Sequence, residues 1–327
     1  MKKSLVALVV LGSFVGAASA ASSVTLYGTA EIAYQKEGGV WQTLKNTNGG
    51  FQQRAPGESR VGFKGEEDLG NGMAAFFQLE AKFSMDTGAS DGSNFFDEKS
   101  VVGLSFVNGA HKVYFGKAPS PIDRLGNNVG HLHTDYSTQM SEGGWRNGAF
   151  YDFTQGGFSV VAAATTKGGV LGNASEGVSG TKASYGLSAK YSASNWTFGA
   201  GWQADHATVK NEWKVVGSYT FNPVTLSGSY ARAKGYAFDK GTTWQAALSG
   251  KLTANDTLFV NYGQQKWTYS GVGSNKLTKY GVGYSHALSK RTSVFANIAR
   301  AKASNNWVGG SSSHSGTGWD LGVKHTF

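Results

Sequence analysis

The sequence predicts an all-β fold, a transmembrane antiparallel β-barrel of 16 strands. Three observations predict it. Segments in which large apolar residues alternate with polar or small ones recur about every 19 residues from Val24 to the end. No segment beyond the amino terminus is apolar for long enough to cross a membrane as a helix. The 9 Trp, 14 Tyr and 19 Phe suit strands and membrane interfaces. A closed barrel that is apolar outside and water-filled inside requires this combination.

The amino terminus has the layout of a secretory signal. Lys2 and Lys3 precede an apolar run over 5–15, and small residues over 18–20 form an A-x-A-type cleavage site. The apolar run is shorter than the roughly 20 residues that a membrane-spanning helix needs. The sequence therefore predicts a signal peptide over 1–20 and a mature barrel domain over 21–327.

Composition limits the function classes. Hydrophobic residues make up 40% of the chain, which is low for a large buried core but suits a barrel with a polar interior. Without cysteine there is no disulfide framework, thiol nucleophile or thiolate metal site. Removing Lys2 and Lys3 leaves 28 basic and 21 acidic residues, a formal charge of +7. The basic residues are scattered singly, without the run or helix that would follow a nucleic-acid backbone.

Sixteen period-2 segments bounded by Gly, Asn, Asp or Ser clusters are predicted as strands. Their connections alternate between short turns and long loops, as in an outer-membrane barrel, with the longer ones at 37–57, 118–144, 168–180 and 304–316. The predicted strands are 23–36, 58–67, 73–86, 97–107, 112–117, 145–154, 158–167, 181–192, 196–206, 212–221, 224–235, 242–252, 257–268, 277–288, 292–303 and 317–327.

The alternation also assigns the two faces of each strand. In the last strand, Trp319, Leu321 and Val323 share one face, and elsewhere Lys82 and Lys214 lie opposite the aromatic residues. A charge on the lipid face costs about 2–4 kcal/mol near the midplane of the membrane. The charged faces therefore belong to a wet lumen, and a soluble β-sandwich or propeller is the disfavoured alternative.

Four stretches of the chain resemble the Gram-negative general porins, and most closely those of the beta-proteobacterial and neisserial type. They are residues 23–28, 59–72, the pair 102–105 and 113–117, and the last strand, which ends in Phe327. The resemblance implies a trimeric barrel of the outer membrane, with a long third loop folded into the lumen. It also implies that the outer-membrane assembly machinery reads Phe327 as a signal.

The resemblance further implies a cluster of basic residues on the wall of the constriction. Arg60 and Arg146 fall on two wall arginines of the family, and Lys64 shares the lumen-facing parity of Arg60. A third wall arginine has no match. At that place either Lys99 substitutes for it from a shifted register, or Glu98 reverses the charge.

The inserted loop is best placed at 118–144. Asp123 is followed directly by Arg124, and no carboxylate occurs over 125–134 before Asp135. The loop thus lacks the acidic tip of the enterobacterial porins. We expect Asp123, Arg124 and Asp135 to belong to the constriction together with the wall cations.

Other chemistry has weaker support. His131 and His133 could suggest a metal ion, but no neighbouring Cys or carboxylate cluster completes a site. Glu66 and Glu80 could suggest hydrolysis, but no motif supplies a positioned nucleophile and base. We therefore predict no enzyme activity, no cofactor and no metal. The wall cations also have a structural alternative, in which they pair with loop carboxylates and stiffen the fold.

The predicted function is passive diffusion of small hydrophilic solutes and ions across the outer membrane, with a modest preference for anions. The expected partners are outer-membrane lipid, two further copies in a homotrimer, the assembly machinery and the permeating solutes. Two alternatives remain at this point: a substrate-specific outer-membrane channel, and a barrel that acts mainly as a surface adhesin.

Overall fold

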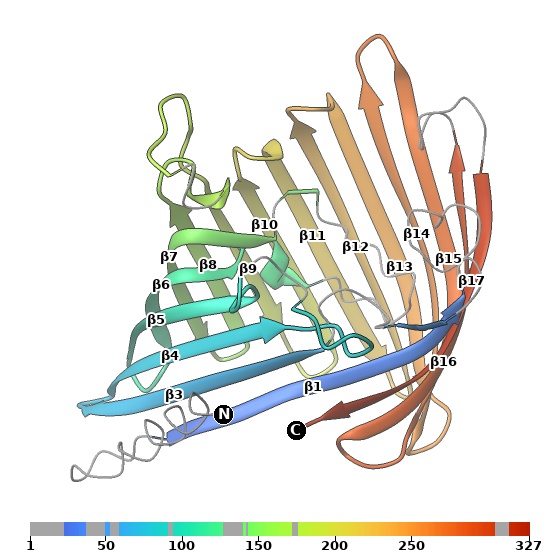
Figure 1. Ribbon diagram of the computed structural model, residues 1–327, viewed down its shortest axis with the longest axis horizontal. Helices are drawn as coiled ribbons and strands as arrows, with labels where there is room; N and C mark the ends of the chain where they lie inside the picture. The colour runs from blue at the N-terminus through green and yellow to red at the C-terminus, as the bar shows by residue number, and fades with distance from the viewer. Residues whose placement is uncertain are drawn as a thin grey trace.

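One sheet closes on itself to form a barrel (Figure 1). Neighbouring strands pair antiparallel throughout, as the registers of consecutive strands show. The computed structural model describes residues 23–36, 50–52, 59–90, 94–126, 140–141, 143–171, 176–304 and 314–327. The predicted signal peptide and the middle of the third long loop lie outside the described residues.

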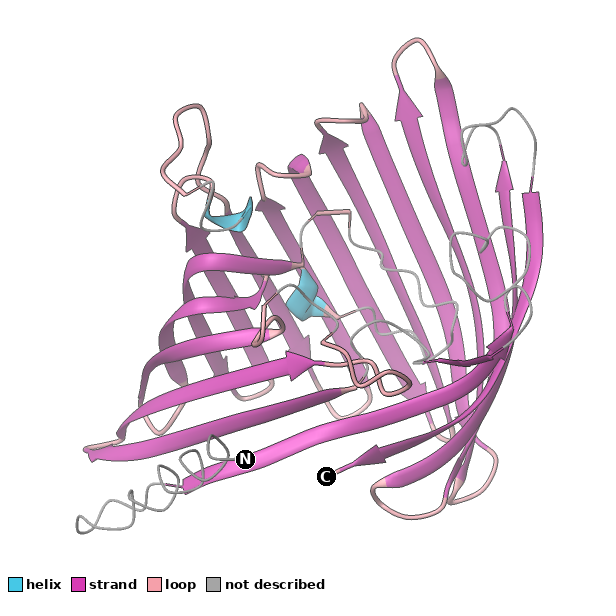
Figure 2. Ribbon diagram, viewed as in Figure 1, coloured by secondary structure: helices cyan, strands magenta, loops and turns pink. Residues whose placement is uncertain are grey.

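The strands and the two short 3₁₀ turns follow one another around the barrel in chain order. Figure 2 shows that strand dominates the described chain and that the 3₁₀ turns lie in loops. No helix among the described residues is long and apolar enough to cross a membrane. The elements are β1 (Ser23–Lys36), β2 (Gly50–Gln52), β3 (Arg60–Gly70), β4 (Met73–Lys82), β5 (Lys99–Phe106), β6 (His111–Pro119), η2 (Asp123–Leu125), β7 (Gly144–Gln155), β8 (Phe158–Thr165), η3 (Gly169–Leu171), β9 (Tyr185–Ser192), β10 (Trp196–Ala204), β11 (Val209–Phe221), β12 (Val224–Gly235), β13 (Lys240–Lys251), β14 (Asp256–Tyr269), β15 (Gly273–Ala287), β16 (Thr292–Ser304) and β17 (His314–Thr326).

The barrel has 16 wall strands, which confirms the predicted fold class. β1 pairs with β17 on one edge and with β3 on the other, and this double pairing closes the sheet. The short β2 was not predicted. It pairs with the last part of β1, on the same edge as β3, and so extends the line of β3 rather than adding a wall strand.

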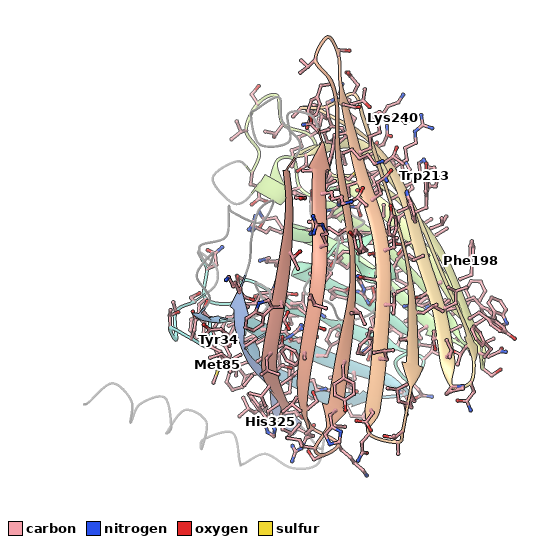
Figure 3. All side chains as sticks on the ribbon, turned by 90° about the vertical axis from the view of Figure 1, so that its right-hand side faces the viewer. Tyr34, Met85, Phe198, Trp213, Lys240 and His325 are labelled. Carbon is pink, nitrogen blue, oxygen red and sulfur yellow. The ribbon has the colours of Figure 1, made fainter. Side chains whose placement is uncertain are left out.

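The two faces of the strands have the predicted chemistry. On the outside, Phe198 is 55% exposed and Trp213 is 39% exposed, and both side chains project from the outer surface in Figure 3. On the inside, Gln203 and Glu212 are 0% exposed and Lys214 is 1% exposed. Lys82 and Lys214 thus have the inward parity that the alternation predicted. The polar and charged side chains therefore lie on the inner face, and the outer face that meets lipid is left apolar.

The carboxyl-terminal residue lies at the seam of the barrel. The backbone of Phe327 exchanges two hydrogen bonds of 3.1 Å with that of Gly28. The Phe327 ring also fills the space that a Cβ at Gly28 would occupy, so this position favours glycine. Thr326 bonds to the backbone of Arg291 in the short turn before β16. The chain therefore ends at the rim of short turns, as predicted.

Candidate functional site

A carboxylate network lies on the inner wall formed by β1, β3 and β4. Glu80 is 7% exposed. Its Oε2 accepts a 2.9 Å hydrogen bond from Tyr27 Oη, and its Oε1 lies 3.4 Å from Nη1 of Arg60. Arg60 therefore faces the lumen, as predicted, and shares its carboxylate partner with a tyrosine.

The strand registers explain how this network forms. Gly62 pairs with Tyr27 across β1 and β3, and a Cβ at Gly62 would collide with the Tyr27 ring. The missing side chain lets the ring lie against the wall. Gln78 then donates a 2.6 Å hydrogen bond to Tyr27 Oη. The tyrosine hydroxyl is thus fixed between an amide and a carboxylate.

Lys99 and Glu98 both lie beside this wall, with different partners. Lys99 begins β5 opposite Glu80, and its Nζ donates a 3.2 Å hydrogen bond to Oε1 of Gln78. Glu98 lies just before the strand and forms a 2.6 Å ion pair with Lys82. Both residues thus contact inward-facing side chains of β4, Lys99 through Gln78 and Glu98 through Lys82, and their part in a constriction stays a prediction.

Lys64 lies further along the same wall and nearer the rim of short turns. Its Nζ is 5.4 Å from the centroid of the Tyr27 ring, a cation–π geometry. Lys112 makes the same kind of contact with Phe76, at 5.2 Å. Both lysines line one recess of the inner wall. Lys64 has the predicted inward parity, but it lies along the wall from Arg60 rather than beside it.

The first described part of the long loop is fixed by an ion pair. Arg124, in η2, donates to both carboxylate oxygens of Asp152 on β7, at 3.1 Å and 2.7 Å. It also donates to Tyr114 Oη on β6. A bidentate arginine–carboxylate pair fixes orientation as well as distance. Arg124 therefore anchors the loop to the inner wall.

Hydrophobic contacts hold the same turn from the other side. Ile122 is 0% exposed and Leu125 is 2% exposed. Leu125 packs over Gly199 and Gly201 of β10, whose missing side chains leave room for it. The backbone of Ile122 donates a 3.1 Å hydrogen bond to the inward-facing Gln203. η2 thus lies against inward-facing side chains of β6, β7 and β10, and Figure 2 shows it as one of the two cyan turns.

The last described part of the loop is fixed by a second carboxylate. Glu212 on β11 accepts backbone hydrogen bonds from Met140 at 3.0 Å and Ser141 at 2.8 Å. Gln203 donates a 2.6 Å hydrogen bond to Ser141 Oγ. Both described ends of the loop therefore contact the inner wall. Asp135 falls in the stretch 127–139, outside the described residues, and its placement stays a prediction.

Asp123 is exposed to the lumen beside this anchor. Although the residue is exposed, the protein around its carboxylate displaces much of the water that would otherwise solvate it. This enclosure raises the pKa of Asp123 to about 6, and the positive charge of Lys214 opposes the shift. Asp123 and Arg124 are adjacent in sequence, yet one carries a free charge into the lumen while the other is held by Asp152.

Arg146 contacts a different part of the molecule. Its Nη1 donates a 3.2 Å hydrogen bond to the carbonyl of Val170 in η3, within the connection between β8 and β9. Lys117 on β6 lies close enough to interact with it electrostatically. The structure thus places Arg146 with η3 and Lys117, whereas Arg60 and Lys99 share the hydrogen-bond network of Glu80 and Gln78.

The barrel, its charged inner wall and the two described loop ends that contact this wall are the features of a channel. The family signature described as Gram-negative porin matches residues 7–306 of the chain. The chain belongs to this family. It is therefore an outer-membrane porin, and the predicted beta-proteobacterial and neisserial type is confirmed by its relatives.

Two of these relatives are similar over very different lengths. The porin is 27% identical to outer membrane porin protein 32 of Delftia acidovorans over 371 aligned residues, covering 100% of both chains. It is 33% identical to the major outer membrane protein P.IB of Neisseria lactamica over 145 residues, covering 42% of this chain and 40% of that protein. The relatives are channel proteins rather than enzymes.

Solved structures of similar fold support the same architecture. An anion-selective porin from Comamonas acidovorans superimposes with a TM-score of 0.73 at 22% identity, covering 94% of this chain and 100% of that one. The trimer form of OmpT of Vibrio cholerae superimposes with a TM-score of 0.68 at 13% identity, covering 94% and 100%. At these identities the likeness shows the fold alone.

Sequence reasoning missed the partners that hold the porin's loop. Asp152, Gln203 and Glu212 all lie on predicted strands with inward parity, so their direction could have been read from the alternation. Their pairing with loop residues could not, because contacts between a loop and a distant wall leave no periodic signal. Gln78 also has inward parity, but the alternation cannot show that it is the partner of Lys99.

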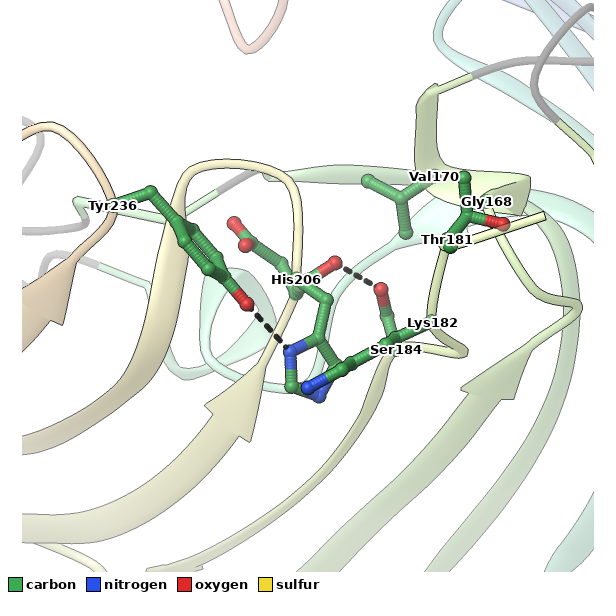
Figure 4. Close-up of a pocket in the computed structure, with 9 residues that line it drawn as sticks. Gly168, Val170, Thr181, Lys182, Ser184, His206 and Tyr236 are labelled. Atoms are coloured by element: carbon green, nitrogen blue, oxygen red, sulfur yellow. Dashed lines mark hydrogen bonds between the residues drawn. The ribbon is translucent and has the colours of Figure 1, made fainter. Parts of the chain in front are cut away.

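A second recess lies at the opposite rim of the porin, next to the connection between β8 and β9. Figure 4 shows His206 and Tyr236, whose ring nitrogen Nδ1 and hydroxyl are 3.1 Å apart, with Lys182 beside them. Partial burial and the nearby Lys182 lower the pKa of His206. Among the described residues, no group of three His, Asp or Glu side chains could hold a metal ion.

Proposed function

We propose that this porin is a diffusion pore with a modest preference for anions, whose constriction is formed by the β3–β5 wall and the third loop. The proposal makes the stretch 127–139, between the two anchored ends of the loop, part of the lumen. Arg60, Lys99 and Arg146 supply positive charge, while Asp123 and Asp135 oppose it. Arg124 holds the loop in position.

The observation that carries the proposal is the pairing of Lys99 with a neutral side chain. Its Nζ bonds to the neutral Gln78 amide, whereas Glu80, opposite it on β4, acts on it through space without an ion pair between the two in the described contacts. Arg60 shares the Glu80 carboxylate with Tyr27, and the distance from Arg60 Nη1 to Glu80 Oε1 is a long 3.4 Å. Charges on the wall of a narrow pore bias the entry of ions of opposite sign. The similar solved porin from Comamonas acidovorans, described as anion-selective, supports the same direction.

The substrate-specific alternative finds little support on this wall. Inward aromatic rings do occur, and those of Tyr114 and Phe150 stack with centroids 5.1 Å apart. They are only 4% and 2% exposed, however, and so cannot offer an accessible ring face on which a sugar could stack. The porin is proposed to act without catalysis or cofactor, and no residue is assigned a catalytic role.

Single-channel recording in planar bilayers tests the diffusion proposal. The open-channel current should rise in proportion to salt concentration without saturating. A current that saturates at low solute concentration would support the substrate-specific alternative, and the absence of any current from folded protein would support the adhesin.

The assembly of the porin follows the same reasoning. We infer that residues 1–20 are removed on export, that three copies form the trimer, and that Phe327 is read by the assembly machinery. Replacing Phe327 with Ser should lower the amount of folded barrel in the outer membrane while leaving export to the periplasm intact. Unchanged amounts of folded, heat-modifiable protein would show that Phe327 is not an assembly signal.

A further inference from the structure

The connection between β8 and β9 begins with a segment that lies against the inner wall. This segment, residues 166–171, contains η3 and is here called the η3 segment. Its Val170 is 2% exposed and packs in one cluster with Trp145 and Phe150 of β7. Phe150 is followed by Tyr151, which is 37% exposed on the outer face, so by alternation the Phe150 ring lies on the inner face of the wall. The η3 segment therefore lies inside the barrel.

Two neighbouring residues near the start of β7 hold this segment by its backbone. Nη1 of Arg146 donates a 3.2 Å hydrogen bond to the carbonyl of Val170, and the side-chain amide of Asn147 donates one of 3.4 Å to the carbonyl of Gly169. The backbone carbonyl of Asn147 accepts a 3.1 Å hydrogen bond from the backbone of Thr166. The η3 segment is thus fixed to the wall at three of its six residues, in addition to its apolar contact.

The local sequence suits this close approach at two positions. Asn147 has a φ of 50°, in the left-handed region that asparagine adopts more readily than most residues, and it lies beside the register shift between Gly116 and Ala118. At Gly169, a Cβ would lie 2.6 Å from Thr166 Oγ1 and 3.1 Å from the Cβ of Asn147. A larger side chain at Gly169 would therefore push the η3 segment away from the wall.

The η3 segment and the third loop rest on the same part of the wall. Tyr114 belongs to the cluster of Val170, and its hydroxyl accepts a hydrogen bond from Arg124 in η2. Ala207, in the turn between β10 and β11, packs against the same cluster. Both 3₁₀ turns, shown in cyan in Figure 2, therefore have a common foundation on the inner face. Described parts of three connections meet on this side of the lumen.

We propose that the η3 segment is a second restriction of the pore, which filters solutes by size at the mouth on the long-loop side. This inference rests on the proposed function as a diffusion pore. A segment fixed inside the wall occupies part of the lumen cross-section, and the free width of a pore limits which hydrophilic solutes pass. The restriction is steric, because apolar packing and backbone hydrogen bonds hold the segment in place. It therefore acts on uncharged solutes as well as on ions.

The test compares the same substitution at two valines of one connection. Val170→Asn places an amide in the apolar cluster and should release the η3 segment, because a buried polar group without partners is costly. Val178→Asn is the matched control, since Val178 is 49% exposed. Swelling of porin-loaded liposomes in uncharged sugars measures the size limit. The rate for a disaccharide relative to a monosaccharide should rise roughly two-fold in Val170→Asn and stay at the wild-type value in Val178→Asn.

The two proposals fail in different ways in this assay. Equal rate ratios in both variants and wild type, with swelling intact, would overturn the η3 segment as a restriction. Swelling in no sugar at all would overturn the diffusion pore, and this inference with it. A higher ratio in Val170→Asn supports the restriction whichever ion the wild-type pore prefers, because the sugars carry no charge.

A disulfide tests the placement of the η3 segment and decides the matter if Val170→Asn does not fold. The chain has no cysteine, and the 3.1 Å between Cβ positions 147 and 169 is near the spacing in disulfides, about 3.5–4.5 Å. Asn147→Cys with Gly169→Cys should form a bond in the folded barrel. Mass spectrometry detects it, because trypsin cleaves after Lys167 between the two positions. The oxidised pore should keep the wild-type sugar ratio, and reduction should raise it. Absence of the bond, or a ratio that reduction leaves unchanged, would overturn the inference.

Discussion

Two arginines of the proposed constriction, Arg124 in the loop and Arg60 on the wall, have very different partners. Arg124 donates to both oxygens of Asp152, at 3.1 Å and 2.7 Å, and to a tyrosine. Arg60 has one contact of 3.4 Å with Glu80, whose other oxygen is taken by Tyr27. A cation that is fully paired fixes geometry. A cation that is loosely paired leaves a field for permeating ions.

The two arginines should differ most in how much they contribute to the stability of the barrel. Arg124→Gln should lower the free energy of unfolding by about 2 kcal/mol, because it leaves the enclosed Asp152 carboxylate without its charged partner. Arg60→Gln should cost less than about 1 kcal/mol, since its side chain is 35% exposed and the pair is long. Urea unfolding of the folded barrel measures both. Equal losses would show that the two arginines are anchored alike.

A second prediction concerns the other end of the loop. Glu212 accepts backbone hydrogen bonds from Met140 and Ser141, so Glu212→Gln should weaken this anchor by removing a charged acceptor. We expect noisier and larger single-channel currents, with the barrel still folded. Glu98→Gln is the matched control, because Glu98 pairs with Lys82 and holds no described part of the loop. Current noise equal to that of wild-type protein would show that the contacts of η2 are enough to position the loop.

The smallest expected effect is a pH dependence of the charge near Arg124, which Asp123 directly precedes. Enclosure raises the pKa of Asp123 to about 6, so this carboxylate is charged at pH 7.5 and neutral at pH 5. Loss of a negative charge from the lumen should strengthen the anion preference in acid, by roughly two-fold in permeability ratio or less. Asp123→Asn should show the acid preference at both pH values. A preference that weakens in acid would contradict this assignment.

Much of the barrel could be predicted from the sequence, because alternation along each strand is a local signal. Trp319, Leu321 and Val323 are exposed on the outer face as predicted, and His325, which interrupts this row, pairs with Thr292 near the short-turn rim. The short β2 escaped prediction because 3 residues are too few to show a period.

The site was less predictable than the fold. The strand alternation predicted that Arg60 and Lys64 face the lumen. It could not assign the partners of Glu98 and Lys99, because these depend on the residue at which β5 begins. It also could not show that Arg146 contacts Val170, because that contact depends on the path of a loop. Net charge was a poor guide, since several cations, such as Lys36, Lys234 and Lys240, are exposed at outward-facing positions of their strands.

We expect the loosely paired wall cations to give the pore its ion preference. The zero-current potential in a potassium chloride gradient measures this preference directly. Wild-type protein should prefer chloride over potassium in dilute salt, and higher salt should reduce the preference by screening. Arg60→Ser should shift the potential toward cations without loss of folding, and Lys99→Gln should do the same. A wild-type preference for potassium, or variants that leave the potential unchanged, would show that these wall cations do not set the ion preference.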